Sequence, residues 1–314
     1  MPAYNVLIAD GLEENGQAIL RSSARVDDRS GISPEELAQV INGYEALIVR
    51  SRTRVTAQVF AAAGRLKVVG RAGVGVDNID LEAAKAHGVT VVNAPTSTSL
   101  AVVELTIGLM LALAREIPRA DAGMKADQWP KKELSGTELY GKTLGILGMG
   151  RIGAEVGNRA AAAFGMTVLG YDPLLSPEEI TRRGAQPVSL DDLYARADYL
   201  SLHLPLTAET RSMVSEQAFE RMKRGIRVVC AARGGIIDET ALLSALESGQ
   251  VAGAALDVFA TEPPGGTDLV RHPKVIATPH IGAQTEEAQA RAAEDIAHEV
   301  LAALKGEPLR WKVV

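Results

Sequence analysis

The stretch Lys142-Thr-Leu-Gly-Ile-Leu-Gly-Met-Gly-Arg-Ile-Gly153 decides the fold. Its first six residues form an apolar run typical of a strand, and the glycine pattern G-x-G-x-x-G follows directly. A helical pattern then continues over Ala154–Phe164. In a strand–turn–helix of this kind, Gly148 permits the tight turn, Gly150 lets a pyrophosphate approach the backbone, and Gly153 lets the helix pack closely on the strand. The stretch therefore predicts a dinucleotide-binding fold.

A carboxylate at the end of the next strand narrows the choice of dinucleotide. Met166–Tyr171 is typical of a strand, and Asp172 follows it, 19 residues after Gly153. A carboxylate at this place accepts hydrogen bonds from the adenosine ribose hydroxyls and repels a 2′-phosphate. Because Pro173 and two leucines come next, with no arginine to accommodate NADP, the sequence predicts NAD as the cofactor.

Strand-like and helical segments alternate along the whole chain. The 314 residues are enough for about two domains, each able to bury a core. Strands apolar on both faces that alternate with helices are typical of parallel sheets covered on each side. We therefore predict an α/β protein with two Rossmann-like, doubly wound parallel sheets. The candidate strands are Val6–Ala9, Ala46–Val49, Lys67–Val69, Val89–Val92, Thr143–Leu147, Thr167–Gly170, Tyr199–Leu202, Arg227–Val229 and Val251–Leu256.

Two further helices have a bearing on the organisation of the domains. Ser99–Ile117 is apolar on nearly all sides, which is typical of a buried helix, either in a core or against another subunit. Thr285–Lys305 begins with acidic residues and ends before a glycine, as helices commonly do. The sequence alone allows this last helix to cover either domain.

Composition excludes several classes of function. With 39 acidic and 33 basic residues the net charge is −6, and no basic block is present, so a nucleic-acid partner is not expected. The single cysteine, Cys230, excludes an internal disulfide and a cysteine-cluster metal site, and it fits a reducing cytoplasm. The longest apolar stretch, Leu105–Ala114, is too short for a membrane span, and the first residues lack the basic region of a signal peptide. We expect a cytoplasmic protein with neither a metal nor a membrane partner.

Candidate acid–base groups follow strands of the second sheet. A nicotinamide enzyme needs a group that moves the substrate proton, and histidine suits this task because it titrates near neutrality. Of the five histidines, His280 comes just after a short apolar run, in Thr278-Pro-His-Ile-Gly282. Arg233 follows the strand at 227–229, and Asp257 and Glu262 follow the strand at 251–256. Their shared position at one sheet edge predicts a hydride-transfer site.

These segments together resemble the D-isomer-specific 2-hydroxyacid dehydrogenase family over essentially the whole chain. The motifs that carry the resemblance are Val49–Thr53, Gly70-Arg-Ala-Gly-Val-Gly-Val-Asp-Asn-Ile-Asp80, Asn93-Ala-Pro95, Gly148–Gly153, Ala232–Asp238, Asp257–Pro264 and Thr278–Gly282. The resemblance implies a catalytic triad of Arg233, Glu262 and His280. His280 would exchange a proton with the 2-hydroxyl, Glu262 would orient the ring and favour its protonated form, and Arg233 would hold the substrate carboxylate.

The resemblance also implies which residues bind the two ligands. Asp257 would lie near the nicotinamide carboxamide. The implied cofactor-binding residues are Gly148, Gly150, Arg151, Ile152, Gly153, Asp172, His203, Leu204, Pro205, Ala231, Ala232, Arg233, Asp257, His280 and Gly282. The implied substrate-binding residues are Arg50, Arg52, Val74, Gly75, Thr98, Lys131, Arg233 and His280. Arg50, Arg52 and Lys131 match cations that would bind a phosphorylated acid, and Lys131 would approach the site of a neighbouring subunit.

The family's layout implies a discontinuous substrate domain, residues 1–96 with 284–314, around an NAD-binding domain of residues 97–283. The helix from Ser99 would then lie at a homodimer interface. Three departures from the family pattern stand out. Ser97-Thr98 replaces the usual Gly-Asn, Cys230 replaces an asparagine, and the chain ends at Val314 without the C-terminal regulatory domain of longer members. We therefore expect no feedback through such a domain.

The expected reaction is the NAD-dependent oxidation of D-3-phosphoglycerate to 3-phosphohydroxypyruvate, in serine biosynthesis. One alternative is a glyoxylate, hydroxypyruvate or other 2-ketoacid reductase on the same scaffold. A more distant alternative is an NAD-sensing corepressor, which would need a hydrophobic peptide cleft. A formate dehydrogenase would want glutamine in place of Glu262.

Overall fold

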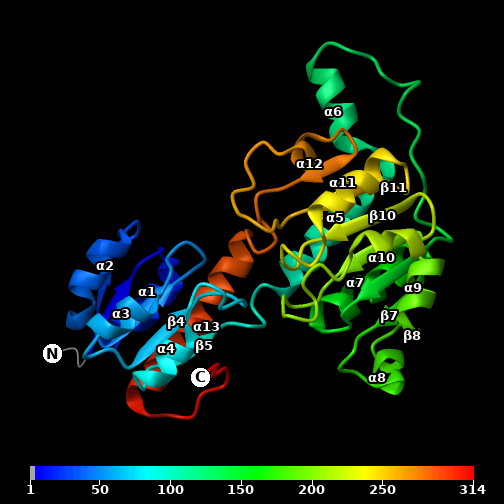
Figure 1. Ribbon diagram of the computed structural model, residues 1–314. Helices are drawn as coiled ribbons and strands as arrows, with labels where there is room; N and C mark the ends of the chain where they lie inside the picture. The colour runs from blue at the N-terminus through cyan, green and yellow to red at the C-terminus, as the bar shows by residue number, and fades with distance from the viewer. Residues whose placement is uncertain (1–3) are drawn as a thin grey trace. The chain divides into compact units, whose positions relative to one another are not determined.

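The computed structural model describes residues 4–314, which divide into two compact units (Figure 1). The first unit comprises residues 1–99 and 283–314, and the second comprises residues 100–282. Each unit has one parallel sheet with helices packed against it, so the predicted α/β class is confirmed.

The first unit has a five-stranded parallel sheet in the order β2-β1-β3-β4-β5. Its strands are β1 (Tyr4–Ile8), β2 (Ala24–Asp28), β3 (Ala46–Val49), β4 (Val68–Arg71) and β5 (Thr90–Asn93). Its helices are α1 (Glu14–Arg21), α2 (Pro34–Val40), a 3-10 turn (Ile41–Gly43), α3 (Ala57–Ala62), α4 (Leu81–Ala86) and α13 (Glu286–Lys305). Because all five strands run in the same direction, their carboxyl ends lie along a single sheet edge.

The last helix, α13, covers one face of this first sheet. Its Ile296 and Val300 are completely buried, in one hydrophobic cluster with Val6 and Ile8 of β1. The buried carboxylate of Glu299 accepts hydrogen bonds from the backbone N–H groups of Arg310 and Trp311. The segment after the helix is thereby held against β5, where the C-terminus lies (Figure 1).

The second unit has a seven-stranded parallel sheet in the order β12-β11-β10-β9-β6-β7-β8. Its strands are β6 (Thr143–Leu147), β7 (Thr167–Tyr171), β8 (Gln186–Pro187), β9 (Tyr199–Leu202), β10 (Ile226–Cys230), β11 (Val251–Leu256) and β12 (Val275–Ala277). Its helices are α5 (Ser99–Arg115), α6 (Ile117–Lys125), α7 (Arg151–Phe164), α8 (Pro177–Arg182), α9 (Leu190–Arg196), α10 (Glu216–Arg221), α11 (Glu239–Glu247) and α12 (Asp268–Arg271).

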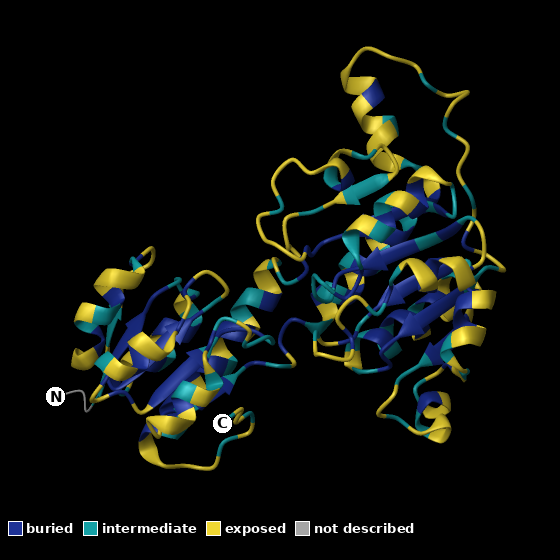
Figure 2. Ribbon diagram, in the orientation of Figure 1, coloured by how far each residue is buried: buried dark blue, intermediate teal, exposed yellow. Residues whose placement is uncertain are grey.

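The inner strands of this second sheet, β6, β9, β10 and β11, are buried, as their dark colour in Figure 2 shows. Along β10, Val228 and Cys230 belong to the hydrophobic cluster on one face and Val229 to the cluster on the other. Successive side chains of a strand point to opposite faces, so a strand covered on both sides must be apolar throughout. This is why the strand signal in the sequence was a continuous apolar run.

Some predicted elements differ from the observed ones. The helix predicted over Ser99–Ile117 ends at Arg115, because Glu116 has a left-handed backbone (φ 50°) that starts a new helix, α6. Within the single chain, Leu100 is 42% exposed and Glu104 is exposed, so the whole helix is not buried in the core of its own unit. The strands β2, β8 and β12 were not among the predicted ones, because they are short or polar edge strands with a weak apolar signal. None of the helices within residues 4–314 is long and apolar enough to cross a membrane.

Candidate functional site

The glycine-rich turn joins β6 to the N-terminus of α7. Gly148 adopts a φ of 94°, which side chains disfavour. A Cβ on Gly153 would lie 2.0 Å from the carbonyl oxygen of Gly148, so only glycine lets α7 approach the turn this closely. A Cβ on Gly150 would meet no heavy atom within 4 Å. The N-cap residue of α7 is Gly150 itself, which has no side chain to cap the helix, so the space there and the first turn with Arg151 and Ile152 fit a pyrophosphate.

Asp172 lies directly beside this turn. Its Oδ2 accepts a hydrogen bond of 2.9 Å from the backbone N–H of Met149, and its Oδ1 accepts one of 3.0 Å from Leu174. On the other side of Met149, the guanidinium of Arg183 donates a hydrogen bond of 2.7 Å to the backbone carbonyl. The turn is therefore held from both sides, by an expected carboxylate and by an arginine that the sequence analysis did not select.

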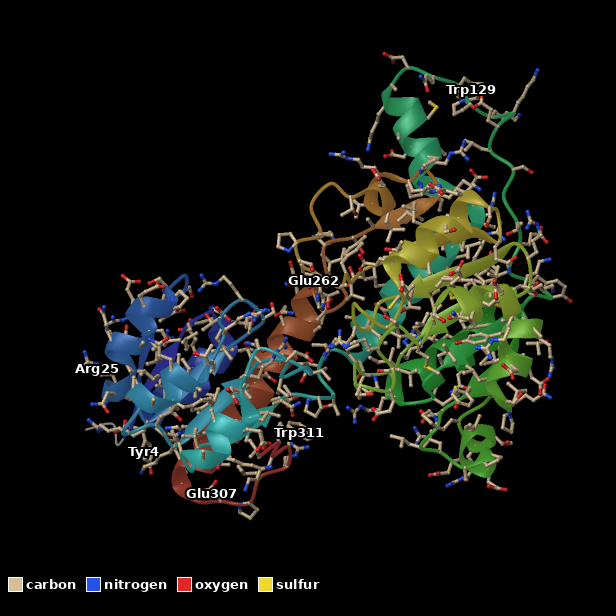
Figure 3. All side chains as sticks on the ribbon, viewed as in Figure 1. Tyr4, Arg25, Trp129, Glu262, Glu307 and Trp311 are labelled. Carbon is tan, nitrogen blue, oxygen red and sulfur yellow. The ribbon has the colours of Figure 1, made fainter. Side chains whose placement is uncertain are left out.

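His280 and Glu262 form a hydrogen-bonded pair in the second unit. His280 Nδ1 lies 2.8 Å from Glu262 Oε2, and the backbone N–H of Phe259 donates a 3.1 Å hydrogen bond to Glu262 Oε1. Partial burial tends to raise the pKa of Glu262, but these two hydrogen bonds and the charges of His280 and Arg233 together lower it. Glu262, which is labelled in Figure 3, is thus a carboxylate at neutral pH, and these contacts engage both of its oxygens.

Arg233 comes from the loop that follows β10. Its Nη1 donates a 2.7 Å hydrogen bond to the carbonyl of Ala232, and the side chain is half-buried. Because its positive charge contributes to the lowered pKa of Glu262, the structure brings Arg233, Glu262 and His280 into one electrostatic neighbourhood. That neighbourhood offers a cation, a carboxylate and an accessible imidazole.

Asp257 organises the turn that carries His280. The side chain is 1% exposed, and it accepts hydrogen bonds from Thr278 Oγ1 (2.6 Å), Ile281 N (2.8 Å) and Gly282 N (2.8 Å). His280 itself has a left-handed backbone (φ 53°), which is uncommon for a residue other than glycine. In this structure Asp257 therefore fixes the conformation that presents His280.

The remaining residues predicted to bind the cofactor follow β9 and β10. His203, Leu204 and Pro205 continue from β9, and Ala231 and Ala232 continue from β10. Desolvation lowers the pKa of His203 to about 4, so its ring, which lies 2.8 Å from Ser201 Oγ, is neutral at pH 7. These segments, the glycine-rich turn and Asp172 share the carboxyl edge of the sheet, where α/β folds bind ligands.

Cys230 ends β10, and desolvation raises the pKa of its buried thiol to about 11. Within residues 4–314 no group of His, Cys, Asp and Glu is arranged to hold a metal ion.

The predicted substrate residues of the first unit lie on neighbouring loops. Arg50 and Arg52 follow β3, and Val74 and Gly75 follow β4. The amide of Asn93, at the end of β5, donates a 2.7 Å hydrogen bond to the carbonyl of Val74 and orients that turn.

Two other predicted substrate residues are placed elsewhere. Thr98 is buried next to Ser97, whose hydroxyl donates to Asp295 and whose carbonyl accepts from Arg291, both on α13. Lys131 is exposed on the segment after α6, two residues beyond the Trp129 labelled in Figure 3.

Comparison with known proteins agrees with this geometry. The family model described as D-isomer specific 2-hydroxyacid dehydrogenase, NAD binding domain, matches residues 107–282. The chain belongs to this family. It is 50% identical to a D-3-phosphoglycerate dehydrogenase of Rattus norvegicus over 97% of its own length and 57% of the relative's. It is 48% identical to that of Methanocaldococcus jannaschii over 96% and 58%. The chain thus spans little more than half the length of these curated relatives.

Solved structures of the family are similar over nearly the whole chain. A glyoxylate reductase from Paecilomyes thermophila has a TM-score of 0.90 at 32% identity, covering 100% of this chain and 99% of that one. A D-lactate dehydrogenase from Aquifex aeolicus, complexed with NAD and lactic acid, has a TM-score of 0.83 at 30% identity, with 96% of each chain covered. The predicted family, fold class and NAD cofactor are therefore confirmed.

Two residues that hold loops of the candidate site, Arg183 and Asp10, were not predicted from the sequence. Arg183 lies 34 positions from its partner Met149, and Asp10 lies 40 positions from Arg50. Neither belongs to a recognisable motif. The sequence gives a local signal for Asp10 alone, because this carboxylate directly follows an apolar run.

Proposed function

We propose that this chain is the dehydrogenase portion of an enzyme that oxidises D-3-phosphoglycerate to 3-phosphohydroxypyruvate with NAD, a step of serine biosynthesis. The observation that carries the proposal is the His280–Glu262 pair with Arg233 beside it. The names of the most similar curated relatives support the phosphorylated substrate. The arginines on the loop after β3 supply cations suited to a phosphate.

In the oxidation, His280 takes the proton of the 2-hydroxyl. Because Nδ1 faces Glu262, Nε2 is the ring nitrogen that receives this proton. Glu262 keeps the ring oriented and stabilises the imidazolium that results. The guanidinium of Arg233 holds the substrate carboxylate with two parallel N–H donors, which lysine cannot do. Bound NAD would supply the acceptor for the hydride from C2. In the reverse direction the imidazolium of His280 returns the proton to the carbonyl oxygen.

We propose that the residues predicted above to bind NAD and the substrate have these roles. NAD would occupy the carboxyl edge of the second sheet, between the glycine-rich turn and the loops after β9 and β10. The substrate would be held by Arg233, by the N–H groups of Val74 and Gly75, and by the cations of the loop after β3. Asp257 would act mainly by fixing the turn of His280, since three donors already engage its carboxylate.

A reductase of unphosphorylated 2-ketoacids is the second candidate. It is favoured by the similarity to a glyoxylate reductase, at 32% identity. It is also favoured by Ser97-Thr98, which replaces the glycine-asparagine pair usual in the family. The two candidates differ only in the substrate, so steady-state kinetics decides between them.

The test is NADH formation from D-3-phosphoglycerate beside D-glycerate, with reduction of hydroxypyruvate and glyoxylate in reverse. We expect a preference of at least tenfold in kcat/KM for the phosphorylated acid. His280→Asn should lower kcat by roughly 10²–10⁴-fold, whereas His298→Asn, an exposed histidine on α13, should leave it unchanged. Better turnover of the unphosphorylated acids would refute the proposed substrate.

We also propose that the protein is a homodimer. The segment from α6 to β6 exposes four large side chains suited to an apolar interface, Ile117 (52%), Met124 (53%), Trp129 (76%) and Tyr140 (76%). A cavity of about 570 Å³ lies beside Tyr140, between the C-terminal ends of α5 and α7. Sedimentation equilibrium tests this. Trp129→Arg should weaken the dimer, while Leu174→Arg, at a side chain 89% exposed elsewhere, should not. A wild-type protein that sediments as a monomer would refute the proposed dimer.

The cytoplasmic location remains a prediction of the sequence.

A further inference from the structure

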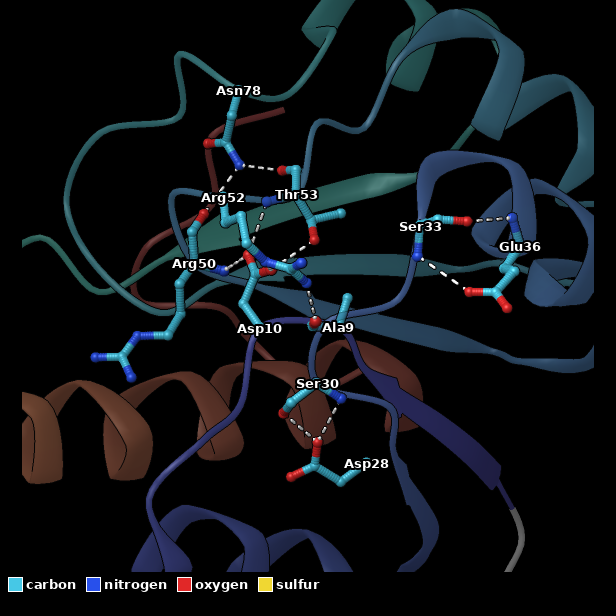
Figure 4. Close-up of polar contacts among 10 residues, drawn as sticks. All are labelled: Ala9, Asp10, Asp28, Ser30, Ser33, Glu36, Arg50, Arg52, Thr53 and Asn78. Carbon is cyan, nitrogen blue, oxygen red and sulfur yellow. Dashed lines mark hydrogen bonds and ion pairs between the residues drawn. The ribbon is translucent and has the colours of Figure 1, made fainter. Parts of the chain in front are cut away.

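One buried carboxylate holds the loop that carries both candidate phosphate-binding arginines. Asp10 follows β1, and its side chain is 3% exposed. Its Oδ2 accepts hydrogen bonds from the backbone N–H groups of Arg50 (2.8 Å) and Thr53 (3.0 Å). Its Oδ1 accepts from Thr53 Oγ1 (2.5 Å) and Arg52 Nε (3.2 Å). Figure 4 shows these four donors gathered around the carboxylate.

The sheet order explains why Asp10 reaches this loop. β1 lies next to β3, so the residues after both strands meet at the same edge of the sheet. A buried carboxylate without partners would be strongly destabilising, but here two donors are fixed N–H groups at the first and last residues of the four-residue loop. One side chain thereby sets the backbone conformation of the whole loop.

A second contact ties this loop to the glycine turn after β4. The amide Nδ2 of Asn78 donates to the carbonyl of Arg50 (2.9 Å) and to that of Thr53 (2.6 Å). Asp10 therefore engages the N–H groups and Asn78 the carbonyls of the same two residues. Loops that follow three different strands are joined into one rigid network.

The side chains of Arg50 and Arg52 have different partners within this network. Arg52 folds back over Asp10, and its Nη2 also donates a 2.9 Å hydrogen bond to the carbonyl of Ala9. The side chain of Arg50 extends away from Asp10 (Figure 4). Its Nη1 lies 3.3 Å from Oε1 of Glu13, whose side chain is 33% exposed. Arg52 is therefore paired with a buried carboxylate and a backbone carbonyl, whereas Arg50 is paired with a carboxylate that solvent can reach.

We propose that Asp10 is a positioning residue for substrate selection: by fixing the Arg50–Thr53 loop and engaging Arg52, it leaves Arg50 as the guanidinium that binds the substrate's phosphate. This inference rests on the proposed function, because it concerns the phosphorylated substrate. It separates two arginines that sequence reasoning treated alike. Arg50 binds substrate, and Arg52 belongs to the support of the loop.

The experiment compares variants by their selectivity, the ratio of kcat/KM for D-3-phosphoglycerate to that for D-glycerate. Asp10→Asn replaces one carboxylate oxygen with an NH2 group, which cannot accept the hydrogen bonds of the loop. It should raise KM for the phosphorylated acid about tenfold, with kcat and the KM for D-glycerate nearly unchanged. Thr53→Val keeps the side-chain volume but removes one of the four hydrogen bonds, so a smaller rise of about threefold is expected. Arg50→Gln should abolish the selectivity, and Arg52→Gln should reduce it only a few-fold.

Asp28→Asn is the matched control. Asp28 is the last residue of the neighbouring strand β2, and its Oδ1 accepts hydrogen bonds from the N–H and the hydroxyl of Ser30 (Figure 4). Its substitution should leave selectivity unchanged. The circular dichroism spectrum of each variant, which includes the first unit, reports whether that variant is folded. If Asp10→Asn does not fold, Thr53→Val and Arg52→Gln still carry the test.

A purely structural role for Asp10 would lower the melting temperature without changing selectivity. The inference is overturned if folded Asp10→Asn or Thr53→Val keeps the wild-type selectivity, or if Arg52→Gln loses as much as Arg50→Gln. A wild-type enzyme that does not prefer the phosphorylated acid would instead refute the proposed function, and this inference with it. The two failures are therefore distinguishable.

Discussion

Gly150→Ala separates what the glycine-rich turn does for the fold from what it does for the cofactor. Gly150 has φ −69° and ψ −164°, an extended conformation open to alanine. The added Cβ would have no heavy atom within 4 Å. The protein without cofactor therefore has room for the methyl group, and we expect its melting temperature to stay within about 2 °C of wild type.

The cofactor should sense the same methyl group strongly. A pyrophosphate that approaches the backbone of Gly150 would be overpacked, at a free-energy cost of about 1–3 kcal/mol. This corresponds to a roughly 5- to 150-fold increase in the Kd of NADH. The assay is a fluorescence titration with NADH in the absence of substrate. A Kd equal to that of wild type would refute the reasoning, because the pyrophosphate would then not lie against this residue.

Gly153→Ala provides the contrasting variant. Its Cβ would lie 2.0 Å from the carbonyl oxygen of Gly148 and 3.0 Å from Ile146 Cγ2, so the unliganded protein itself must distort. We expect a clear drop in its melting temperature, unlike that of Gly150→Ala. An equal drop in both variants would contradict the open space assigned to Gly150.

Three further predictions concern single side chains. Arg183→Ala removes the hydrogen bond to the Met149 carbonyl and should raise the Kd of NADH roughly 2- to 10-fold in the same titration. His203→Gln should make stability less sensitive to acid. Because burial lowers the pKa of His203 from 6.5 to about 4, the unfolded state binds a proton that the folded state does not between these pH values. Wild-type stability should therefore fall by up to about 3 kcal/mol as the pH drops through this window, measurable by urea unfolding at several pH values. Glu13→Gln removes the carboxylate 3.3 Å from Arg50 and should lower KM for D-3-phosphoglycerate about twofold in steady-state assays.

Each of these variants has a control of the same chemical type. Arg182→Ala, at a side chain 75% exposed, should not change the Kd of NADH. The exposed His298→Gln should leave the acid sensitivity as it is in wild type. Glu14→Gln, at a side chain 75% exposed, should not lower KM. A control that changes as much as its partner variant would show that the assigned contact is not the cause.

Much of the nucleotide-binding unit could be predicted from the sequence. The signals there are local: the glycine-rich turn, the strand and the helix are contiguous, and Asp172 follows the next strand at a spacing that the fold imposes. Arg183 was missed because its carbonyl partner lies 34 residues away and any polar side chain of sufficient length could have served. The helix predicted to Ile117 was too long because a single left-handed residue, Glu116, leaves no signal in an apolar pattern.

The sequence by itself determined most of the elements, their apolar faces and the glycine-rich turn, because each follows from backbone preferences and periodicity within a short stretch. Only the tertiary structure decided that α13 covers the first sheet and that Asp257 fixes the turn of His280. It also decided that Asp10 accepts a hydrogen bond from the backbone N–H of Arg50. Such contacts depend on which strands are neighbours and on their register. Strand order is set by the packing of the whole sheet, and no residue pattern near Asp10 encodes it.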